Sequence, residues 1–163
     1  MKKLIYTLLI IIALTNNSFS AGSSSDNEST PKVSDYTKAK NLIKAAKKYE
    51  KKGKTEKAQK RYTKAQKLLL KSNEKKPLQA DTLNYLGFTT RKLGDYEGGE
   101  EFYLQGLQIE PNHNGINEYL GELYVATNRM DMAKERLEVL KTCNCEEYGE
   151  LKEIIEGTKK SKY

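Results

Sequence analysis

Hydrophobic residues recur at helical spacing from residue 36 onward, with polar and mostly charged positions between them. The first stretch places the following residues on one helical face: Tyr36, Ala39, Leu42, Ile43, Ala46 and Tyr49. After Gly53 interrupts this pattern, the next stretch does the same with Ala58, Tyr62, Ala65 and Leu69. The spacing predicts two helices joined at Gly53, the second running from near Thr55 to near Asn73.

The pattern of large and small residues then recurs at a fixed offset along the chain. The matching positions are Tyr85-Leu86-Gly87 with Tyr119-Leu120-Gly121, Gly99 with Ala133, and Tyr103 with Leu137. The small residues let a neighbouring helix approach closely, and the large ones fill the space between two helices. Pro111 cannot continue a helix, so it marks the end of one helix pair. Two further helix pairs are therefore predicted in the second half of the chain.

The spacing of Leu83, Leu86 and Gly87, followed by Gly99, Tyr103 and Pro111, resembles the tetratricopeptide repeat. Leu93-Gly94-Asp95-Tyr96 also resembles the turn between the two helices of that family. The resemblance implies an all-α fold, a right-handed α-solenoid of antiparallel helix pairs. It places three repeats at about 34–76, 80–113 and 114–145, followed by a cap helix at 146–157. It further implies a concave groove lined by the first helix of each pair.

The last repeat departs from the pattern of the family. Asn117 stands where a large apolar residue is expected, and Cys145 stands where proline is expected. Terminal repeats are often atypical, so both departures fit the end of an array. After them, Tyr148, Leu151, Ile154 and Ile155 form one apolar stripe, which looks like the cap helix that closes such arrays.

The N-terminal segment 1–20 is predicted to be a signal peptide. Met1-Lys2-Lys3 precedes an uncharged run at 4–14, and eleven helical residues reach about half of a bilayer core of roughly 30 Å. Because Ser18 and Ser20 are small, we expect cleavage after Ser20 and export to the periplasm or the medium, with no membrane span left in the mature chain. An uncleaved anchor is the alternative. The polar residues at 21–33 predict a flexible linker.

Charge is distributed unevenly along the chain. The formal net charge is +7, but residues 32–76 carry 17 Lys or Arg against four Asp or Glu, and residues 77–163 are net negative at −6. The basic surface of the first repeat includes Lys44, Lys47, Lys51 and Lys54. Three interpretations of this basic surface are open. It is a solvated lysine-rich surface, a contact for an acidic protein or envelope polymer, or one side of a head-to-tail self-association into a homo-oligomer. Export disfavours nucleic acid as the partner.

By the resemblance, six residues face the groove and form the predicted partner-binding site: Asn84, Phe88, Arg91, Lys92, Glu118 and Glu122. Phe88 is either an exposed anchor for a peptide or a residue that packs on an adjacent helix, and both alternatives stay open. Some family members clamp a terminal carboxylate with Lys, Asn and Arg. Asn84 is the one matching residue here, and Glu118 and Glu122 would repel a carboxylate, which excludes that ligand.

The two cysteines, Cys143 and Cys145, lie in the predicted turn before the cap helix. Three alternatives are open for an exported chain: a disulfide, two free or packed thiols, and a soft-metal site for copper or zinc. The run Cys143-Asn144-Cys145-Glu146-Glu147-Tyr148, followed by Leu151, resembles the ending of a group of bacterial tetratricopeptide proteins. That resemblance supports a structural role for the pair.

Catalytic constellations are not found in the sequence. The single histidine, His113, lies in a loop and is expected to be solvated, and the carboxylates lie on helix surfaces without apolar shelter. We therefore predict a non-enzymatic module of the cell envelope that binds a partner protein or peptide, with no cofactor and no metal. Envelope assembly through the basic first repeat and thiol redox or soft-metal chemistry at Cys143 and Cys145 are the alternatives. Residues 158–163 form a basic tail.

Overall fold

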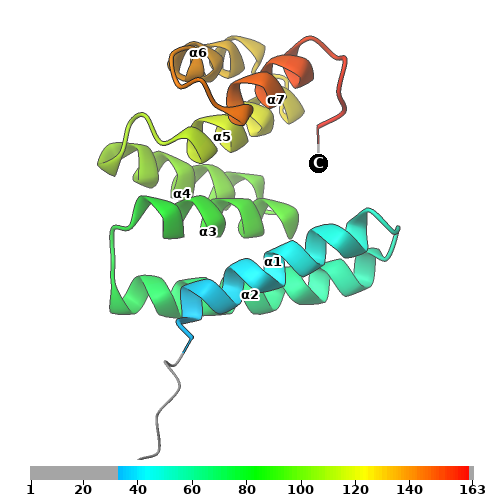
Figure 1. The fold of residues 1–163 in the computed structure, drawn as a ribbon, viewed down its shortest axis with the longest axis vertical. Helices are drawn as coiled ribbons and strands as arrows, with labels where there is room; N and C mark the ends of the chain where they lie inside the picture. Colours follow the sequence, from blue (N-terminus) through cyan, green and yellow to red (C-terminus); the bar gives the residue numbers. More distant parts are fainter. Residues whose placement is uncertain (1–32, 162–163) are drawn as a thin grey trace, which may run out of the picture. The chain divides into compact units, whose positions relative to one another are not determined.

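The computed structural model describes residues 33–161, which form seven α-helices and no strand (Figure 1). The helices are α1 (Asp35–Glu50), α2 (Thr55–Lys75), α3 (Ala80–Lys92), α4 (Tyr96–Ile109), α5 (Asn114–Ala126), α6 (Met130–Leu140) and α7 (Glu146–Ile155). Three helix pairs, α1–α2, α3–α4 and α5–α6, stack in chain order, and α7 packs on α5 and α6. The predicted α-solenoid of helix pairs is confirmed. The predicted signal peptide, residues 21–32 of the linker and residues 162–163 lie outside the described residues.

The two turns that lie one repeat apart each contain a residue with positive φ at the matching position. Gly94, between α3 and α4, has φ +98°, and Asn128, between α5 and α6, has φ +59°. Glycine enters this left-handed region without a steric penalty, and asparagine is among the side chains that tolerate it best. The side chain of Asp95 then caps α4 by accepting a hydrogen bond from the Gly98 amide at 2.9 Å. The repeat seen in the sequence therefore extends to the turns as well as to the apolar positions.

The second helix is longer than the second helices of the later pairs. α2 has 21 residues, against 14 in α4 and 11 in α6, which confirms the long second helix expected from the sequence. Its buried face consists of Ala58, Tyr62, Ala65 and Leu69. These residues form one hydrophobic cluster with Ala39, Ile43 and Ala46 of α1. Alanines on both helices allow the pair to pack closely, and Tyr62 and Leu69 fill the remaining space.

Large side chains pack against small residues at the predicted positions. The ring of Tyr103 from α4 lies directly over Gly87 of α3, and the side chain of Leu151 from α7 lies over Gly121 of α5. Tyr103 and Leu151 are both fully buried. The second of these contacts fixes how α7 docks on the last helix pair.

Asn117 is buried and His113 is nearly so. Both side chains form hydrogen bonds with the backbone around the start of α5. The Asn117 side-chain nitrogen donates to the carbonyls of Pro111 and His113 at 3.0 and 3.1 Å. His113 Nδ1 accepts from the Ile116 amide at 3.2 Å, so the proton of the neutral ring lies on Nε2, which is 3.3 Å from Asp81. The expectation of a solvated histidine was wrong, because the ring caps α5.

Replacing Gly87 with alanine is expected to lower the free energy of unfolding by about 1 kcal/mol. An added Cβ would lie 2.5–2.8 Å from three ring carbons of Tyr103, and that ring is fully buried. Overpacking costs about 1–3 kcal/mol, and the higher helix propensity of alanine returns up to about 1 kcal/mol. Urea denaturation followed by circular dichroism measures the difference.

Gly149→Ala is the matched control for Gly87→Ala. A Cβ at Gly149, in the exposed middle of α7, meets no atom within 4 Å, so only the propensity gain remains. The two glycine substitutions should therefore change stability in opposite directions. If Gly87→Ala is as stabilising as Gly149→Ala, the close packing of Tyr103 on α3 is not rigid.

Candidate functional site on the inner face

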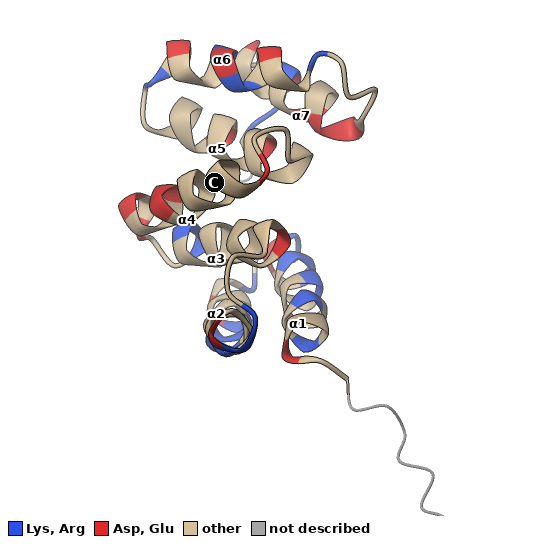
Figure 2. Ribbon diagram, turned by 90° about the vertical axis from the view of Figure 1, so that its left-hand side faces the viewer, with Lys and Arg blue, Asp and Glu red and all other residues tan. Residues whose placement is uncertain are grey.

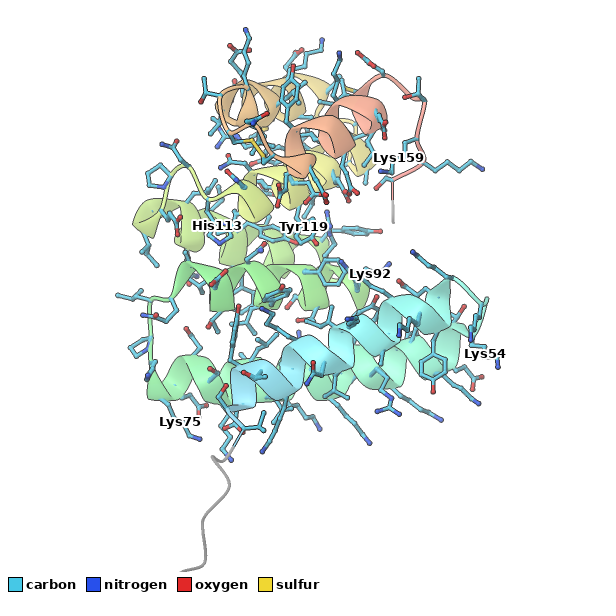
Figure 3. The ribbon with its side chains drawn as sticks, in the orientation of Figure 1. Lys54, Lys75, Lys92, His113, Tyr119 and Lys159 are labelled. Carbon is cyan, nitrogen blue, oxygen red and sulfur yellow. A yellow bond between two sulfur atoms is a disulfide. The ribbon has the colours of Figure 1, made fainter. Side chains whose placement is uncertain are left out.

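The inner face is the side of the body formed by α1, α3, α5 and α7. Direct contacts join α1 to α3, α3 to α5 and α5 to α7, so side chains from consecutive repeats meet there. Figure 3 shows Lys92 and Tyr119 on this side, between α1 and α7, with Lys159 beside α7. All residues of the predicted partner-binding site come from α3 and α5.

Most residues of the predicted binding site are buried rather than exposed. Among them, the following are buried: Asn84, Phe88, Arg91, Glu118 and Glu122. Phe88 is only 1% exposed and packs against the ring of Tyr62 at 5.8 Å and that of Tyr119 at 5.1 Å, centroid to centroid. These positions are therefore used in packing, and the packing alternative for Phe88 is correct.

Lys47 belongs to the inner face, unlike the other lysines of its predicted surface. Its ammonium lies 4.5 Å from the centre of the Phe88 ring and donates to Tyr119 Oη at 3.1 Å. The side chains of Lys44, Lys51 and Lys54 are exposed. Lys47 itself is half-buried. Here it joins α1 to α3 and α5 by a cation–π contact and a hydrogen bond.

Lys92, the remaining predicted site residue, ties α3 to α1. Its ammonium forms an ion pair with Glu50 at 2.7 Å, and the same carboxylate accepts a hydrogen bond from Tyr62 at 2.8 Å. Burial and this hydrogen bond raise the pKa of Tyr62, so the phenol stays neutral and acts as a donor. This network fixes the end of α1 against the second repeat.

A fully buried ion pair connects α3 and α5. The Arg91 guanidinium lies 3.6 Å from the Glu122 carboxylate and donates to the Tyr119 carbonyl at 2.6 Å. Burial lowers the pKa of Arg91, and the nearby Tyr103 and Glu122 act in the opposite direction. Arginine still remains charged, because its ordinary pKa lies far above neutrality. Burial also raises the pKa of Tyr103 and Tyr119, so both phenols stay neutral.

Next to this pair, three carboxylates form what we call the acidic cluster: Glu118, Glu122 and Glu150. One oxygen from each lies within 4.8 Å of the others. Sequence reasoning found Glu118 and Glu122 but missed Glu150, which lies on α7. The signal was present in the apolar stripe of the cap helix. Leu151 packs on Gly121, and this contact brings the preceding residue next to Glu122.

Beside the acidic cluster, a groove of about 400 Å³ opens between α3, α5 and the start of α7. We call it the acidic groove; its walls include Asp81, Asn84, Glu110, Glu118 and Glu147. Asn84 is 6% exposed, and its Oδ1 is buried without a hydrogen-bond partner. The groove therefore offers carboxylates, which are acceptors suited to a cationic group.

Charge is segregated between the ends of the described body. Figure 2 shows Lys and Arg along α1 and α2, and Asp and Glu on α4, α6 and α7. Exposed lysines of α2 include Lys57, Lys60, Lys64, Lys67 and Lys71. The separation into a basic and an acidic part, seen in the sequence, is therefore preserved on the surface.

The structure joins Cys143 and Cys145 in a disulfide within the turn before α7, with their Cα atoms 5.2 Å apart. This is the first of the three alternatives left open by the sequence. A disulfide offers no thiolate for a soft metal. Among the described residues, the acidic cluster is the arrangement that could hold a metal ion. A divalent cation there would lie close to the Arg91 guanidinium, whose positive charge opposes it.

The inner face thus combines aromatic rings, cations and carboxylates from α1, α3, α5 and α7. Within residues 33–161, no helix combines the length and the hydropathy needed to cross a bilayer.

Residues 80–113 match the family model described as "Tetratricopeptide repeat". The chain is similar in fold to the type III secretion translocator chaperone SycD of Yersinia enterocolitica, with a TM-score of 0.52 and 17% identity over 77% of this chain and 85% of that one. The first tetratricopeptide domain of Spaghetti, solved with an HSP90 peptide, has a TM-score of 0.47 and 22% identity, over 77% and 96% of the two chains.

The first such domain of human RPAP3 has a TM-score of 0.47 and 21% identity, and the match covers 77% of this chain and 98% of that one. No curated protein matches the sequence. The repeat at residues 80–113 and the stacked pairs around it together define a helical-repeat body with one tetratricopeptide repeat recognisable from its sequence.

Proposed function

We propose that this protein is a non-enzymatic interaction module of the cell envelope that binds a partner polypeptide in the acidic groove of its inner face. The observation that carries the proposal is the groove itself. It lies beside the buried network of Arg91 and Glu122, is formed by residues of two repeats and α7, and contains the unsatisfied Oδ1 of Asn84. Envelope location follows from the predicted export signal at residues 1–20.

A preformed groove of this kind favours binding. The aromatic residues and ion pairs behind it are packed, so the walls need little reordering when a partner enters. Cationic side chains of a partner can pair with Asp81, Glu110 and Glu147 at the edges of the groove. Phe88 packs against the ring of Tyr119 and holds it in place, and it does not contact the partner.

Selection of a random peptide display library on the full chain tests the proposal. We expect enriched peptides whose affinity falls at least about tenfold in the double variant Asp81→Lys and Glu147→Lys, which reverses the charge at two positions lining the groove. A tenfold loss corresponds to about 1.4 kcal/mol of binding free energy. Fluorescence anisotropy with labelled peptides measures it.

The matched control is Glu97→Lys with Glu101→Lys, which changes the net charge by the same amount at two exposed positions of α4. Neither of these residues lines the groove. Equal losses in the two double variants would mean that net charge, and not the groove, determines binding. Such a result would contradict the proposed function.

A further inference from the structure

The outer face of α2 carries a row of exposed lysines, which we call the lysine stripe: Lys57, Lys60, Lys64, Lys67 and Lys71. Among the seven described helices, α2 packs only on α1 and α3, so this face has no helix over it. We propose that the lysine stripe docks on a membrane surface that contains anionic phospholipids. This inference goes beyond the proposed function and does not depend on it.

The lysine stripe runs straight along the helix. Its members follow one another at alternating intervals of three and four residues. At 3.6 residues per turn, this spacing keeps them within about 80° of one another and gives the stripe a length of about 21 Å. The buried face of α2, which contains Tyr62 and Leu69, lies roughly opposite. A row of point charges of this length fits an extended anionic surface rather than a single small anion.

The protein does not neutralise the charge of the lysine stripe. Residues 57–71 include one further basic residue, Arg61, and no Asp or Glu. Among the described residues, no ion pair or hydrogen bond involves a side chain of the stripe, whereas Lys75 at the end of the same helix pairs with Asp35 at 2.8 Å. The five ammonium groups are therefore available to an anionic partner.

α1 widens the basic surface. Its exposed lysines Lys44, Lys48 and Lys51 also follow one another at intervals of four and three residues. Figure 2 shows α1 and α2 side by side at one end of the described body, with basic residues along both. Two such helices form a layer, and each lysine near an anionic leaflet adds to the attraction. A bilayer is broad enough to contact the whole layer at once.

Two exposed leucines favour a lipid surface over a soluble polyanion. Leu70 lies between Lys67 and Lys71 in the sequence and is 42% exposed, and Leu78, which follows the end of α2, is 67% exposed. Leu78 has φ +57°, a left-handed conformation that is unfavourable for a side chain with a Cβ. Packing within the described body does not account for this exposed, strained leucine. Apolar side chains beside lysines are typical of surfaces that bind at the bilayer interface.

A protein partner fits the lysine stripe less well. The cores of protein interfaces are depleted in lysine and enriched in aromatic residues and arginine. A second copy of the chain could offer the carboxylates of α6, but these already have partners within the same molecule. Asp131 pairs with Lys134 at 3.8 Å. Glu138 pairs with Lys141 at 3.0 Å.

Vesicle flotation of the full chain at low ionic strength tests the proposal. The quantity measured is the ratio of binding to vesicles of phosphatidylcholine with phosphatidylglycerol over binding to vesicles of phosphatidylcholine alone. Taking this ratio cancels any contribution from the apolar run at 4–14. We expect the triple variant Lys60→Glu, Lys64→Glu and Lys67→Glu to lower the ratio at least about thirtyfold. An unchanged ratio would overturn the proposal.

The matched control is Lys134→Glu with Lys141→Glu and Lys152→Glu, which changes the net charge equally at exposed positions on or beside α6 and α7. Equal losses in the two triple variants would mean that net charge, and not the lysine stripe, determines binding, and would contradict the proposal. Circular dichroism checks that both variants fold. If the stripe variant does not, glutamine at the same three positions should still lower the ratio at least about tenfold.

Leu78→Gly tests the apolar part of the surface. Glycine adopts φ +57° without a steric penalty, so the urea midpoint should not fall. Binding to the anionic vesicles should weaken about tenfold, because an apolar side chain is lost from the contact. Double-stranded DNA and polyphosphate are the soluble comparisons. If they bind the stripe as tightly as vesicles do, and Leu78→Gly binds vesicles normally, the partner is a soluble polyanion and lipid docking is overturned.

Two further measurements separate membrane docking from other contacts. Self-association in the absence of lipid that is lost in the stripe variant would assign this face to a second copy and overturn the proposal. The groove variant Asp81→Lys with Glu147→Lys should bind anionic vesicles at least as tightly as the unchanged protein. If library peptides bind in the acidic groove while the vesicle ratio ignores the stripe, the proposed function stands and this inference fails. The reverse outcome leaves membrane docking without the proposed function.

Discussion

Replacing Arg91 with alanine is expected to lower the free energy of unfolding by about 3–5 kcal/mol, because the carboxylate of Glu122 would stay buried without its guanidinium. Both side chains of this pair are fully buried, and Arg91 also donates to the Tyr119 carbonyl. The loss therefore includes a broken hydrogen bond as well as a broken ion pair. Urea denaturation monitored by circular dichroism measures it.

A surface pair of the same chemistry is the control for Arg91. Arg129 pairs with Glu100 through two hydrogen bonds of 2.9 and 2.7 Å, with the two side chains 35% and 17% exposed. Although this geometry is better than that of the buried pair, Arg129→Ala should cost no more than about 1 kcal/mol, because water solvates the carboxylate left behind. Similar losses in both variants would contradict the argument from burial.

The double variant Arg91→Met and Glu122→Met separates charge burial from packing. With both members of the ion pair replaced by apolar side chains, we expect most of the stability lost in Arg91→Ala to return. A double variant as unstable as Arg91→Ala would mean that the packing of the arginine stem, and not the loss of the ion pair, accounts for the lower stability.

Phe88→Ala is the second substitution with a large expected effect, again a loss of about 3–5 kcal/mol. The ring is buried between the rings of Tyr62 and Tyr119, and Lys47 lies over its face. Removing it leaves a cavity where α1, α2, α3 and α5 meet. Thermal and urea denaturation measure the loss, and Phe88→Leu, which keeps most of the volume, should cost about 1 kcal/mol.

Leu104→Ala provides the comparison for Phe88→Ala on the outer surface. Leu104 lies on α4 with 44% of its surface exposed, so its removal should change stability by less than about 0.5 kcal/mol. If Phe88→Ala were equally mild, the ring would be a surface anchor, as the first alternative from the sequence holds. The expected instability also makes Phe88→Ala unsuitable for testing partner binding, and residues at the rim of the acidic groove are better choices.

The helix pairs could be predicted because their signals are local. Small residues such as Gly87 and Gly121 recur at matching positions of consecutive repeats, and each meets a large side chain from another helix. The long α2 followed from the apolar stripe that begins after Gly53 and continues to Leu69. These features depend on the spacing of apolar positions and on residue volume, and both can be read directly from the sequence.

The site could be predicted only in part, because accessibility is not a local property. The spacing of Asn84, Arg91 and Glu118 places them correctly on the inner face. Whether such a residue is exposed depends on side chains from other helices, such as Lys47 from α1, which covers Phe88. Glu150 was missed because it lies on the cap helix, outside the repeats that suggested the groove.

By itself, the sequence determined the seven helices of the described chain, their pairing and the separation of charge between the two ends. The helical period fixes the direction in which each side chain points from the helix axis. A small residue fixes where a partner helix can approach. The tertiary structure alone decided the burial of Phe88 and the gathering of Glu118, Glu122 and Glu150. These outcomes depend on the distance between consecutive helices and on side chains that reach across it, neither of which a single helix specifies.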